Sequence, residues 1–140
     1  MCGITGIYNL NAAPVFRQDL QRMSDTIAHR GPDGEGLHIQ NHVGLAHRRL
    51  AILDLSPKGS QPMMSKDGRW IIVFNGCIYN YLELKQDLRS RGHEFNSTSD
   101  TEVLVEGLAE YGPKFFERLN GMFAVGAYNT QEDALFLSRD

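Results

Sequence analysis

The sequence lacks the features that mark several large classes of protein. It has only two cysteines, at positions 2 and 77, which do not make a disulfide framework or a zinc site. Its longest apolar runs, such as WIIVF at 70–74, are far too short to cross a bilayer. No basic stretch followed by an apolar core marks a secretory signal. We therefore expect a protein of the reducing cytoplasm that does not bind membranes.

An excess of charge of one sign is also missing. The 14 basic and 17 acidic residues leave a net charge of −3 and form no basic block, which argues against nucleic acid as a partner. The five histidines show no metal-ligand spacing, and no glycine-rich phosphate loop is present. We therefore expect no cofactor in this part of the chain.

What the sequence does contain is a series of short strands and helices separated by turn signals. Apolar spacing predicts helices over 16–30, 80–91 and 99–111, with Asn80 and Glu83 capping the second and Ser99 and Glu102 the third. Asn75-Gly76 is expected to stop a central strand that starts at Trp70. The predicted strands are 3–8, 37–40, 43–55, 70–74, 122–129 and 134–140. These elements indicate one α+β domain over 1–140, with its strands in hairpin-like pairs.

Cys2 is the first candidate for chemistry. A thiol near a chain terminus can be no more than a small apolar residue. Removal of Met1, however, would expose an α-amino group on Cys2 itself, and the reference pKa of such a group, about 7.7–8.0, suits a general base. Nucleophile and base would then share one residue, held by a strand whose β-branched and aromatic residues follow directly.

Four further residues offer groups that a thiol nucleophile and its substrate need, although each has a structural explanation as well. Asn75 and Gly76 offer a side-chain amide and an unobstructed backbone N–H to an oxyanion, but Asn-Gly is also a common turn pair. Arg49 can bind a ligand carboxylate or form a structural ion pair. Asp100 can accept a ligand ammonium or complement a helix dipole. Together these groups describe an amino acid whose side chain carries an acyl group, and glutamine fits.

Six segments carry a resemblance to a known family. They read MCGITGIYN, HRGPDGEG, LAHRRLAILDLSPKGSQPM, FNGCIYNY, SDTEV and LNGMFAVGAYN, and they cover nearly the whole chain. In these segments and in their order, the sequence resembles the class II glutamine amidotransferase domains of the N-terminal-nucleophile type. Among them it is most similar to the amino-terminal domain of glutamine-hydrolysing asparagine synthetases.

The resemblance implies a fold, a reaction and a role for each site residue. The fold would be the four-layer αββα sandwich of N-terminal-nucleophile hydrolases. Cys2 would attack the side-chain amide of L-glutamine to form a γ-glutamyl thioester, with Asn75 and Gly76 as the oxyanion hole, and the ammonia would pass to a synthetase. The residues expected to hold glutamine are Arg49, Leu50, Ile52 and Leu53 at its α-carboxylate, Asp100 at its α-amino group, and Asn75, Gly76 and Cys77.

The sequence departs from the family in two places. The family usually reads FNGEIYN, so Cys77 stands where a glutamate is usual. The family also continues beyond the final RD into further strands and then into an ATP-using synthetase domain. We therefore expect a sandwich truncated at its C-terminal end, with a synthetase domain supplied in cis or in trans. ATP and magnesium are expected only in that domain, and a homodimer is one option for assembly.

Two other functions stay open. The first is an amidotransferase-like domain whose chemistry is impaired by Cys77 or by truncation and which serves binding or assembly. The second is another N-terminal-nucleophile amidase of the same fold. Release of glutamate from glutamine distinguishes the proposed enzyme from the first, and the pairing of Arg49 with Asp100 favours a zwitterionic amino acid over the substrates of the second.

Overall fold

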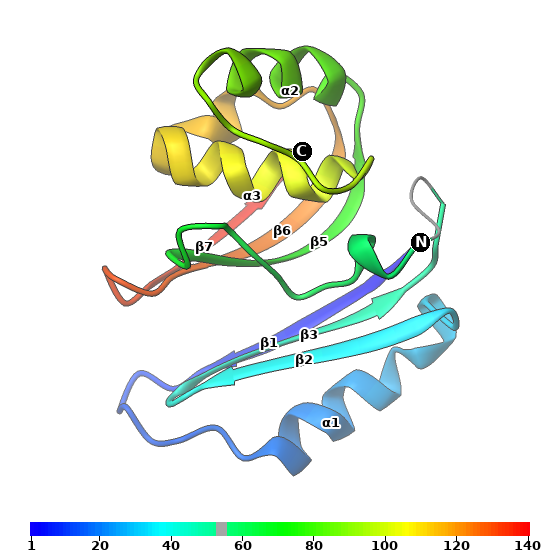
Figure 1. Ribbon diagram of the computed structural model, residues 1–140. Helices are drawn as coiled ribbons and strands as arrows, with labels where there is room; N and C mark the ends of the chain where they lie inside the picture. Colours follow the sequence, from blue (N-terminus) through cyan, green and yellow to red (C-terminus); the bar gives the residue numbers. More distant parts are fainter. Residues whose placement is uncertain (53–55) are drawn as a thin grey trace.

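The computed structural model describes residues 1–52 and 56–140 and shows two β-sheets packed face to face between helices (Figure 1). Sheet A has the strand order β1-β3-β2 and sheet B the order β4-β5-β6-β7, and all neighbours are antiparallel. In Figure 1, α1 lies below sheet A, and α2 and α3 lie above sheet B. The layers are therefore α, β, β and α, and the predicted sandwich is confirmed.

The predicted helices and strands are all present in the predicted order. The structure adds the short strand β4, where no strand was predicted, and β2 begins three residues before the predicted start at 37. The strands are β1 (Gly3–Tyr8), β2 (Gly34–Gln40), β3 (Val43–Arg49), β4 (Met63–Met64), β5 (Trp70–Ile78), β6 (Gly121–Asn129) and β7 (Ala134–Arg139). The helices are α1 (Arg17–Thr26), α2 (Tyr81–Ser90) and α3 (Asp100–Tyr111), with short 3₁₀ turns η1 (Ala28–Arg30), η2 (Pro57–Gly59) and η3 (Gly112–Arg118).

The strand β5 is central because it is buried on both faces. Trp70, Ile72 and Phe74 belong to the apolar cluster under α2 and α3, whereas Ile71 and Val73 belong to the cluster between the two sheets. Such a strand reads as a continuous apolar run rather than as an alternation. A third, smaller cluster lies between sheet A and α1.

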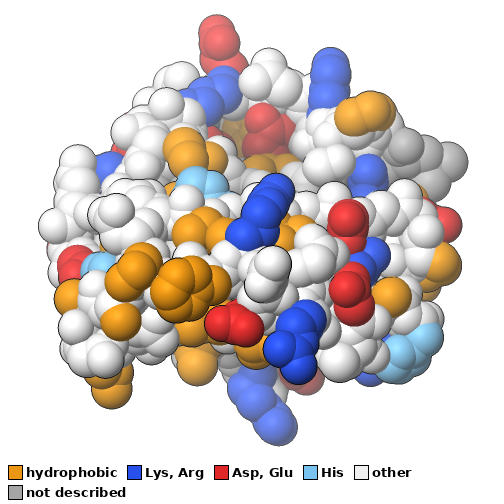
Figure 2. Space-filling model, turned by 90° about the horizontal axis from the view of Figure 1, so that it is seen from below, with side chains coloured by type: hydrophobic (Ala, Val, Ile, Leu, Met, Phe, Trp, Pro, Cys, Tyr) orange, Lys and Arg blue, Asp and Glu red, His pale blue; other side chains and the backbone are white. Residues whose placement is uncertain are grey.

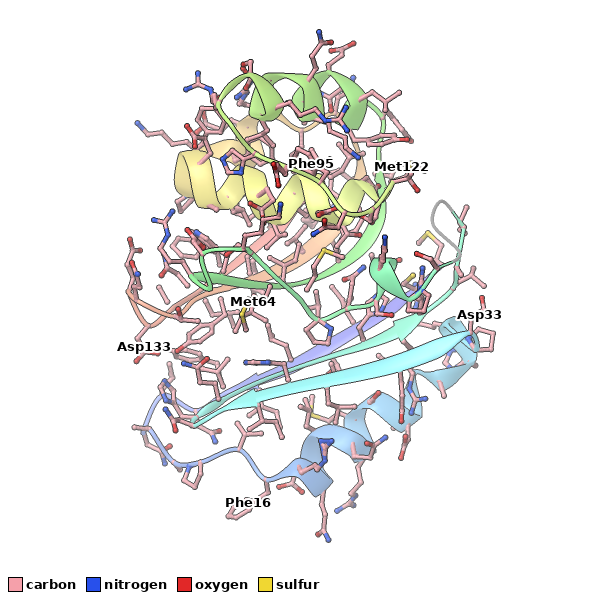
Figure 3. All side chains as sticks on the ribbon, viewed as in Figure 1. Phe16, Asp33, Met64, Phe95, Met122 and Asp133 are labelled. Atoms are coloured by element: carbon pink, nitrogen blue, oxygen red, sulfur yellow. The ribbon has the colours of Figure 1, made fainter. Side chains whose placement is uncertain are left out.

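The two sheets are joined at one end and enclose a cavity at the other. At the joined end, Asp133 in the β6–β7 turn accepts a hydrogen bond from the Tyr128 hydroxyl (2.9 Å) and lies 3.0 Å from Nε2 of His42 in the β2–β3 hairpin. Figure 3 shows Asp133 at this end and Asp33 and Met122 at the opposite end. The N-terminus lies at that opposite end (Figure 1).

Two predicted strand ends are wrong. β5 does not stop at Asn75-Gly76 but runs to Ile78, because its ladder with β6 continues through Ile78 opposite Gly121. β3 ends at Arg49 instead of running to residue 55, and residues 53–55 lie outside the described residues. A turn-forming pair can therefore sit inside a strand when a neighbouring strand stays paired with it.

The two capping pairs are only partly as predicted. Asn80 makes no side-chain cap; its side chain bonds the Arg118 carbonyl and the Asn120 N–H, each at 3.0 Å, and so ties the start of α2 to the segment before β6. The Ser99 side chain does cap α3. Glu102, however, accepts hydrogen bonds from the segment 96–97 and does not complete a capping box.

The face of the molecule drawn in Figure 2 shows little charge segregation. On the face seen from below in Figure 2, acidic and basic side chains are interspersed. In the part of the chain that the structure describes, no helix combines the length and the apolar character needed to cross a bilayer. The expectations about nucleic acid and about the cellular compartment stay predictions.

His93 connects the segment after α2 to α3 through two carboxylates. Its Nδ1 lies 3.0 Å from a Glu106 oxygen and its Nε2 lies 3.0 Å from a Glu110 oxygen. Only an imidazolium can donate both hydrogen bonds when both carboxylates are ionised. Burial opposes this charged form, but the hydrogen bonds to Glu110 and Glu106 outweigh burial and raise the pKa of His93 above 6.5.

We predict that His93→Gln destabilises the protein more at about pH 6 than at about pH 9. Because the pKa of His93 is raised in the folded state, its stabilising contribution is fully present below 6.5 and is lost as the pH rises through the folded-state value. The loss at the lower pH should be on the order of 1 kcal/mol in the free energy of unfolding, measured by urea denaturation. The exposed His29→Gln variant is the control. An equal loss for His93→Gln at both pH values would contradict the assignment.

Candidate functional site

A cavity of about 230 Å³ lies between the sheets at the end where the chain begins. It is smaller than the clefts of about 300–1,000 Å³ that hold drug-sized ligands, and it suits a ligand of amino-acid size. All predicted site residues that the structure describes line it, namely Cys2, Arg49, Leu50, Ile52, Asn75, Gly76, Cys77 and Asp100. Leu53, the one remaining predicted residue, lies outside the described residues.

The pairing of β1 with β3 positions the thiol. Gly3 lies opposite Arg48, so Cys2 lies beside the point where β3 ends. The Cys2 Sγ is 3.3 Å from the Leu50 N–H nitrogen and 3.5 Å from the Leu50 carbonyl oxygen. Arg30 donates from Nε to the Cys2 carbonyl at 3.1 Å. Contacts with Leu50 and Arg30 therefore hold Cys2 in place beside sheet A.

The RGPD segment fixes the backbone that follows β3. The Asp33 N–H donates to the Arg49 carbonyl, and the Asp33 carboxylate accepts from the Ala51 N–H, both at 2.9 Å. Figure 3 shows Asp33 at this end of sheet A. The backbone of residues 49–51 is thus braced from the side that faces away from β1.

On its β4 side, β5 is paired with another strand only at Ile71 and Ile72, and the rest of this edge has no strand beside it. Alternate N–H groups of a strand point to the same edge. The Phe74 N–H donates to the Gln61 side chain at 2.6 Å and the Ile78 N–H donates to the Asp100 side chain at 3.0 Å. The Gly76 N–H lies between them in this alternation and therefore points to the same open edge, into the cavity. A Cβ at Gly76 would lie 2.2 Å from the Met122 carbonyl oxygen, so only glycine fits there.

Asp100 brings a buried carboxylate to the cavity. It starts α3, is 4% exposed, and is the only Asp or Glu among the described residues that line the cavity. Burial raises the pKa of Asp100, and hydrogen bonds from the backbone of Ile78, Thr101 and Asp100 itself partly offset that effect. An ammonium group entering the cavity would stabilise the ionised carboxylate.

Arg49 and His47 lie two residues apart on β3 and both line the cavity. Arg49 donates from Nη1 to the Ser56 carbonyl at 2.8 Å. Burial lowers the pKa of His47 to about 4, while a hydrogen bond to the Phe74 backbone opposes this and the charge of Arg49 adds to it. His47 is therefore neutral at pH 7. Arg49 is the one basic side chain among the described lining residues that is positively charged at this pH.

Cys77 lies on the cavity wall next to Asp100. Burial raises the pKa of the Cys77 thiol, and the nearby carboxylate of Asp100 raises it further. The thiol is therefore neutral at pH 7 and adds no charge to the site.

Sequence reasoning missed several lining residues, among them His47, Gln61, Thr101 and Met122. His47 could have been found, because it shares the period of two with Arg49 on a predicted strand. Gln61 gave no signal, because it lies in a loop without periodicity. Within the described residues, no three His, Cys, Asp or Glu side chains converge in a way that could hold a metal ion.

Several known proteins are similar to this chain. The sequence matches the model of the glutamine amidotransferase domain family over residues 1–140. It is 44% identical over 144 residues to the glutamine-hydrolyzing asparagine synthetase 2 of Bacillus subtilis, and 35% identical over 141 residues to the glutamine-hydrolyzing asparagine synthetase B of Escherichia coli. These alignments cover 100% of this chain but 19% and 25% of the relatives, so the chain spans a quarter of their length or less.

A solved structure with a similar fold is the glutamine phosphoribosylpyrophosphate amidotransferase of B. subtilis complexed with ADP and GMP. The TM-score is 0.76 at 19% sequence identity, and the match covers 98% of this chain and 37% of that chain. At this identity the likeness shows a shared fold.

We predict that Asp100→Asn lowers the pKa of the Cys77 thiol. The substitution removes the neighbouring negative charge that raises this pKa, so more thiolate should be present at about pH 8. Alkylation of Cys77 by iodoacetamide, followed by peptide mass spectrometry, should then be several-fold faster than in the parent protein. Asp19→Asn on the exposed surface of α1 is the control. An unchanged Cys77 rate in Asp100→Asn would show that the two groups do not interact.

Proposed function

Since the chain belongs to the family of glutamine amidotransferase domains, we propose that it hydrolyses the side-chain amide of glutamine to glutamate and ammonia, with Cys2 as the nucleophile. The observation that supports this most is the convergence in one cavity of a thiol, an open-edge N–H, a basic side chain and a buried carboxylate. These are the groups that a thioester mechanism on a zwitterionic amino acid requires.

The proposed reaction begins after removal of Met1. The freed α-amino group of Cys2 takes the thiol proton, and the sulfur attacks the amide carbon of glutamine. The negative charge that develops on the carbonyl oxygen accepts hydrogen bonds from the Gly76 N–H and the Asn75 side-chain amide. The tetrahedral adduct then collapses, the C–N bond breaks, and the α-ammonium returns its proton to the leaving ammonia. A γ-glutamyl thioester on Cys2 remains.

Hydrolysis of the thioester uses the same groups in reverse. The α-amino group takes a proton from water, the oxygen attacks the thioester carbon, and the oxyanion again lies against Gly76 and Asn75. Breaking of the C–S bond releases glutamate, and the proton returns to sulfur. No metal or organic cofactor is needed for either half of the reaction.

Charge complementarity supports the same substrate. Arg49 holds the α-carboxylate of glutamine from the end of β3. Asp100 holds the α-ammonium at the other side of the cavity. Glutamine would thereby enter with its side chain directed toward the thiol.

The ammonia would be passed to an ATP-dependent synthetase domain, in cis or in trans, that makes an amide such as asparagine. The relatives named as asparagine synthetases motivate this part of the proposal, since they are four to five times as long as the aligned region. ATP and magnesium would bind that domain.

One observation favours a second function, a binding module with impaired catalysis. Cys77 is a neutral thiol at a position where the family usually has a glutamate, and Asp100 is left as the single carboxylate in the described lining. Weak glutamine binding would follow from that difference.

We predict that Cys2→Ala abolishes glutaminase activity, by more than about 1,000-fold in kcat, because the nucleophile and its base act as one unit. Addition of residues before Cys2 should have the same effect, since it converts the α-amine into an amide that cannot act as a base. Glutamate release from glutamine is the measurement, and the same residues added after Asp140 serve as the control. Full activity with a blocked amino terminus would overturn the mechanism.

We predict that Cys77→Glu lowers the KM for glutamine with little change in kcat. A second carboxylate beside Asp100 would add a charged hydrogen bond to the glutamine ammonium, worth roughly 1.5–3 kcal/mol, or about one to two powers of ten in affinity. Such an effect on KM alone is the mark of uniform binding.

Cys77→Gln is the matched control, because glutamine has the size of glutamate without its charge. It should leave KM near that of the parent. If both variants change KM equally, size and not charge matters at this position, and if neither does, the thiol does not contact the substrate.

A further inference from the structure

We propose that Gln61 is a positioning residue that sets the spacing between the oxyanion donors on β5 and the ammonium-binding Asp100 on α3. This inference rests on the proposed glutamine hydrolysis, because the two groups must contact opposite parts of one substrate. Gln61 itself would touch neither the reacting atoms nor the ends of the ligand.

The place of Gln61 in the sheet explains what its side chain does. β4 pairs with β5 through Met63 opposite Ile72, so an extension of this register would put Gln61 opposite Phe74. The ladder does not continue to this pair, because β4 comprises Met63 and Met64 only. Instead, the Gln61 Oε1 accepts the Phe74 N–H at 2.6 Å and thereby replaces the missing strand.

The other end of the same amide reaches α3. The Gln61 Nε2 donates to the Thr101 hydroxyl oxygen at 3.3 Å, and Thr101 directly follows Asp100. Gln61 is 8% exposed, so both hydrogen bonds are shielded from water. One buried side chain therefore bridges the strand that carries the oxyanion donors and the helix that carries the carboxylate.

Asp100 makes a second tie between the same two elements. Its side chain accepts the Ile78 N–H at 3.0 Å. The two ties hold β5 at Phe74 and at Ile78, on either side of Gly76. The position of the Gly76 N–H is thus fixed by a hydrogen bond on each side of it along β5, and these bonds set its distance from Asp100.

The backbone of Gln61 is braced from sheet A as well. A Cβ at Gly36 would lie 2.1 Å from the Gln61 carbonyl oxygen, so β2 passes in close contact with this residue. Sheet A also delivers Cys2, through β1 and β3. Gln61 consequently touches all three structural units that contribute to the cavity, namely sheet A, sheet B and α3.

The chemistry makes this spacing matter. An oxyanion donor works only when it lies about 2.7–3.1 Å from the developing charge. A displacement of about 1 Å can reduce the rate by two orders of magnitude. Removal of a side chain that holds the donor strand should therefore change catalysis and not stability alone.

The test substitutes Gln61→Met, which keeps the length of the side chain and removes both hydrogen bonds. At a temperature well below the unfolding transition, we expect kcat to fall about 10- to 100-fold and KM for glutamine to rise. Amide hydrogen exchange should become faster at Phe74, whose N–H loses its acceptor. The exposed Gln131→Met is the control and should change none of these quantities.

Thr101→Val tests the hydrogen bond to α3 separately from the one to β5. It also provides the test if Gln61→Met does not fold. It removes the Thr101 hydroxyl and leaves the Phe74 hydrogen bond in place, so KM should rise while kcat changes less than in Gln61→Met. Gln61→Met and Thr101→Val combined should give less than the sum of the single effects on KM, because they remove one shared hydrogen bond.

The outcomes distinguish this inference from the proposed function. A parent protein that releases no glutamate contradicts the proposed function, and the exchange rate at Phe74 still tests the tie made by Gln61. A Gln61→Met variant that unfolds at a lower temperature but keeps the parent kcat, KM and exchange rates would overturn the positioning role. Gln61 would then contribute to the stability of the fold and not to catalysis.

Discussion

The site depends on one constraint, which is that β5 is longer than its neighbour β4. β4 pairs with β5 over two residues only, so three alternate N–H groups farther along β5, at Phe74, Gly76 and Ile78, have no strand beside them. A buried N–H without a partner costs about 1–3 kcal/mol. Gln61 satisfies the first and Asp100 satisfies the third. The middle one faces the cavity, where a ligand oxygen can accept it. The short pairing of β4 with β5 thus leaves one backbone N–H directed into the cavity.

The second sheet completes the site because the sandwich is joined at one end only. The contact of Asp133 with His42 holds the sheets together at the far end, and the apolar cluster between the sheets sets the distance between them. At the near end, β1 and β3 bring the Cys2 thiol and Arg49 to the cavity from the other side. Groups that are far apart in sequence therefore converge without any of them lying on a long loop.

The family, the layers of the fold and many of the residues that line the cavity could be predicted from the sequence, for different reasons. Cys2, Arg49 and Asp100 stand next to strand or helix ends that local patterns reveal, and the family resemblance is confirmed by the match over residues 1–140. The extension of β5 through Asn75-Gly76 was not predictable locally, because it follows from the partner strand β6. Asn80 stands at a position typical of a helix cap, but its side chain forms hydrogen bonds with the segment before β6 instead. Gln61 acts through two residues distant in sequence, and no local pattern encodes that.

The most direct test of the proposed function is a covalent trap. The purified protein would be incubated with a glutamine analogue that carries an electrophilic ketone carbon in place of the side-chain amide, and the modified peptide would be identified by mass spectrometry. We predict one adduct, on the Cys2 sulfur of a chain that lacks Met1, and protection by excess glutamine but not by excess alanine. Modification of Cys77 instead of Cys2, or an adduct on Cys2 that excess glutamine does not suppress, would contradict it.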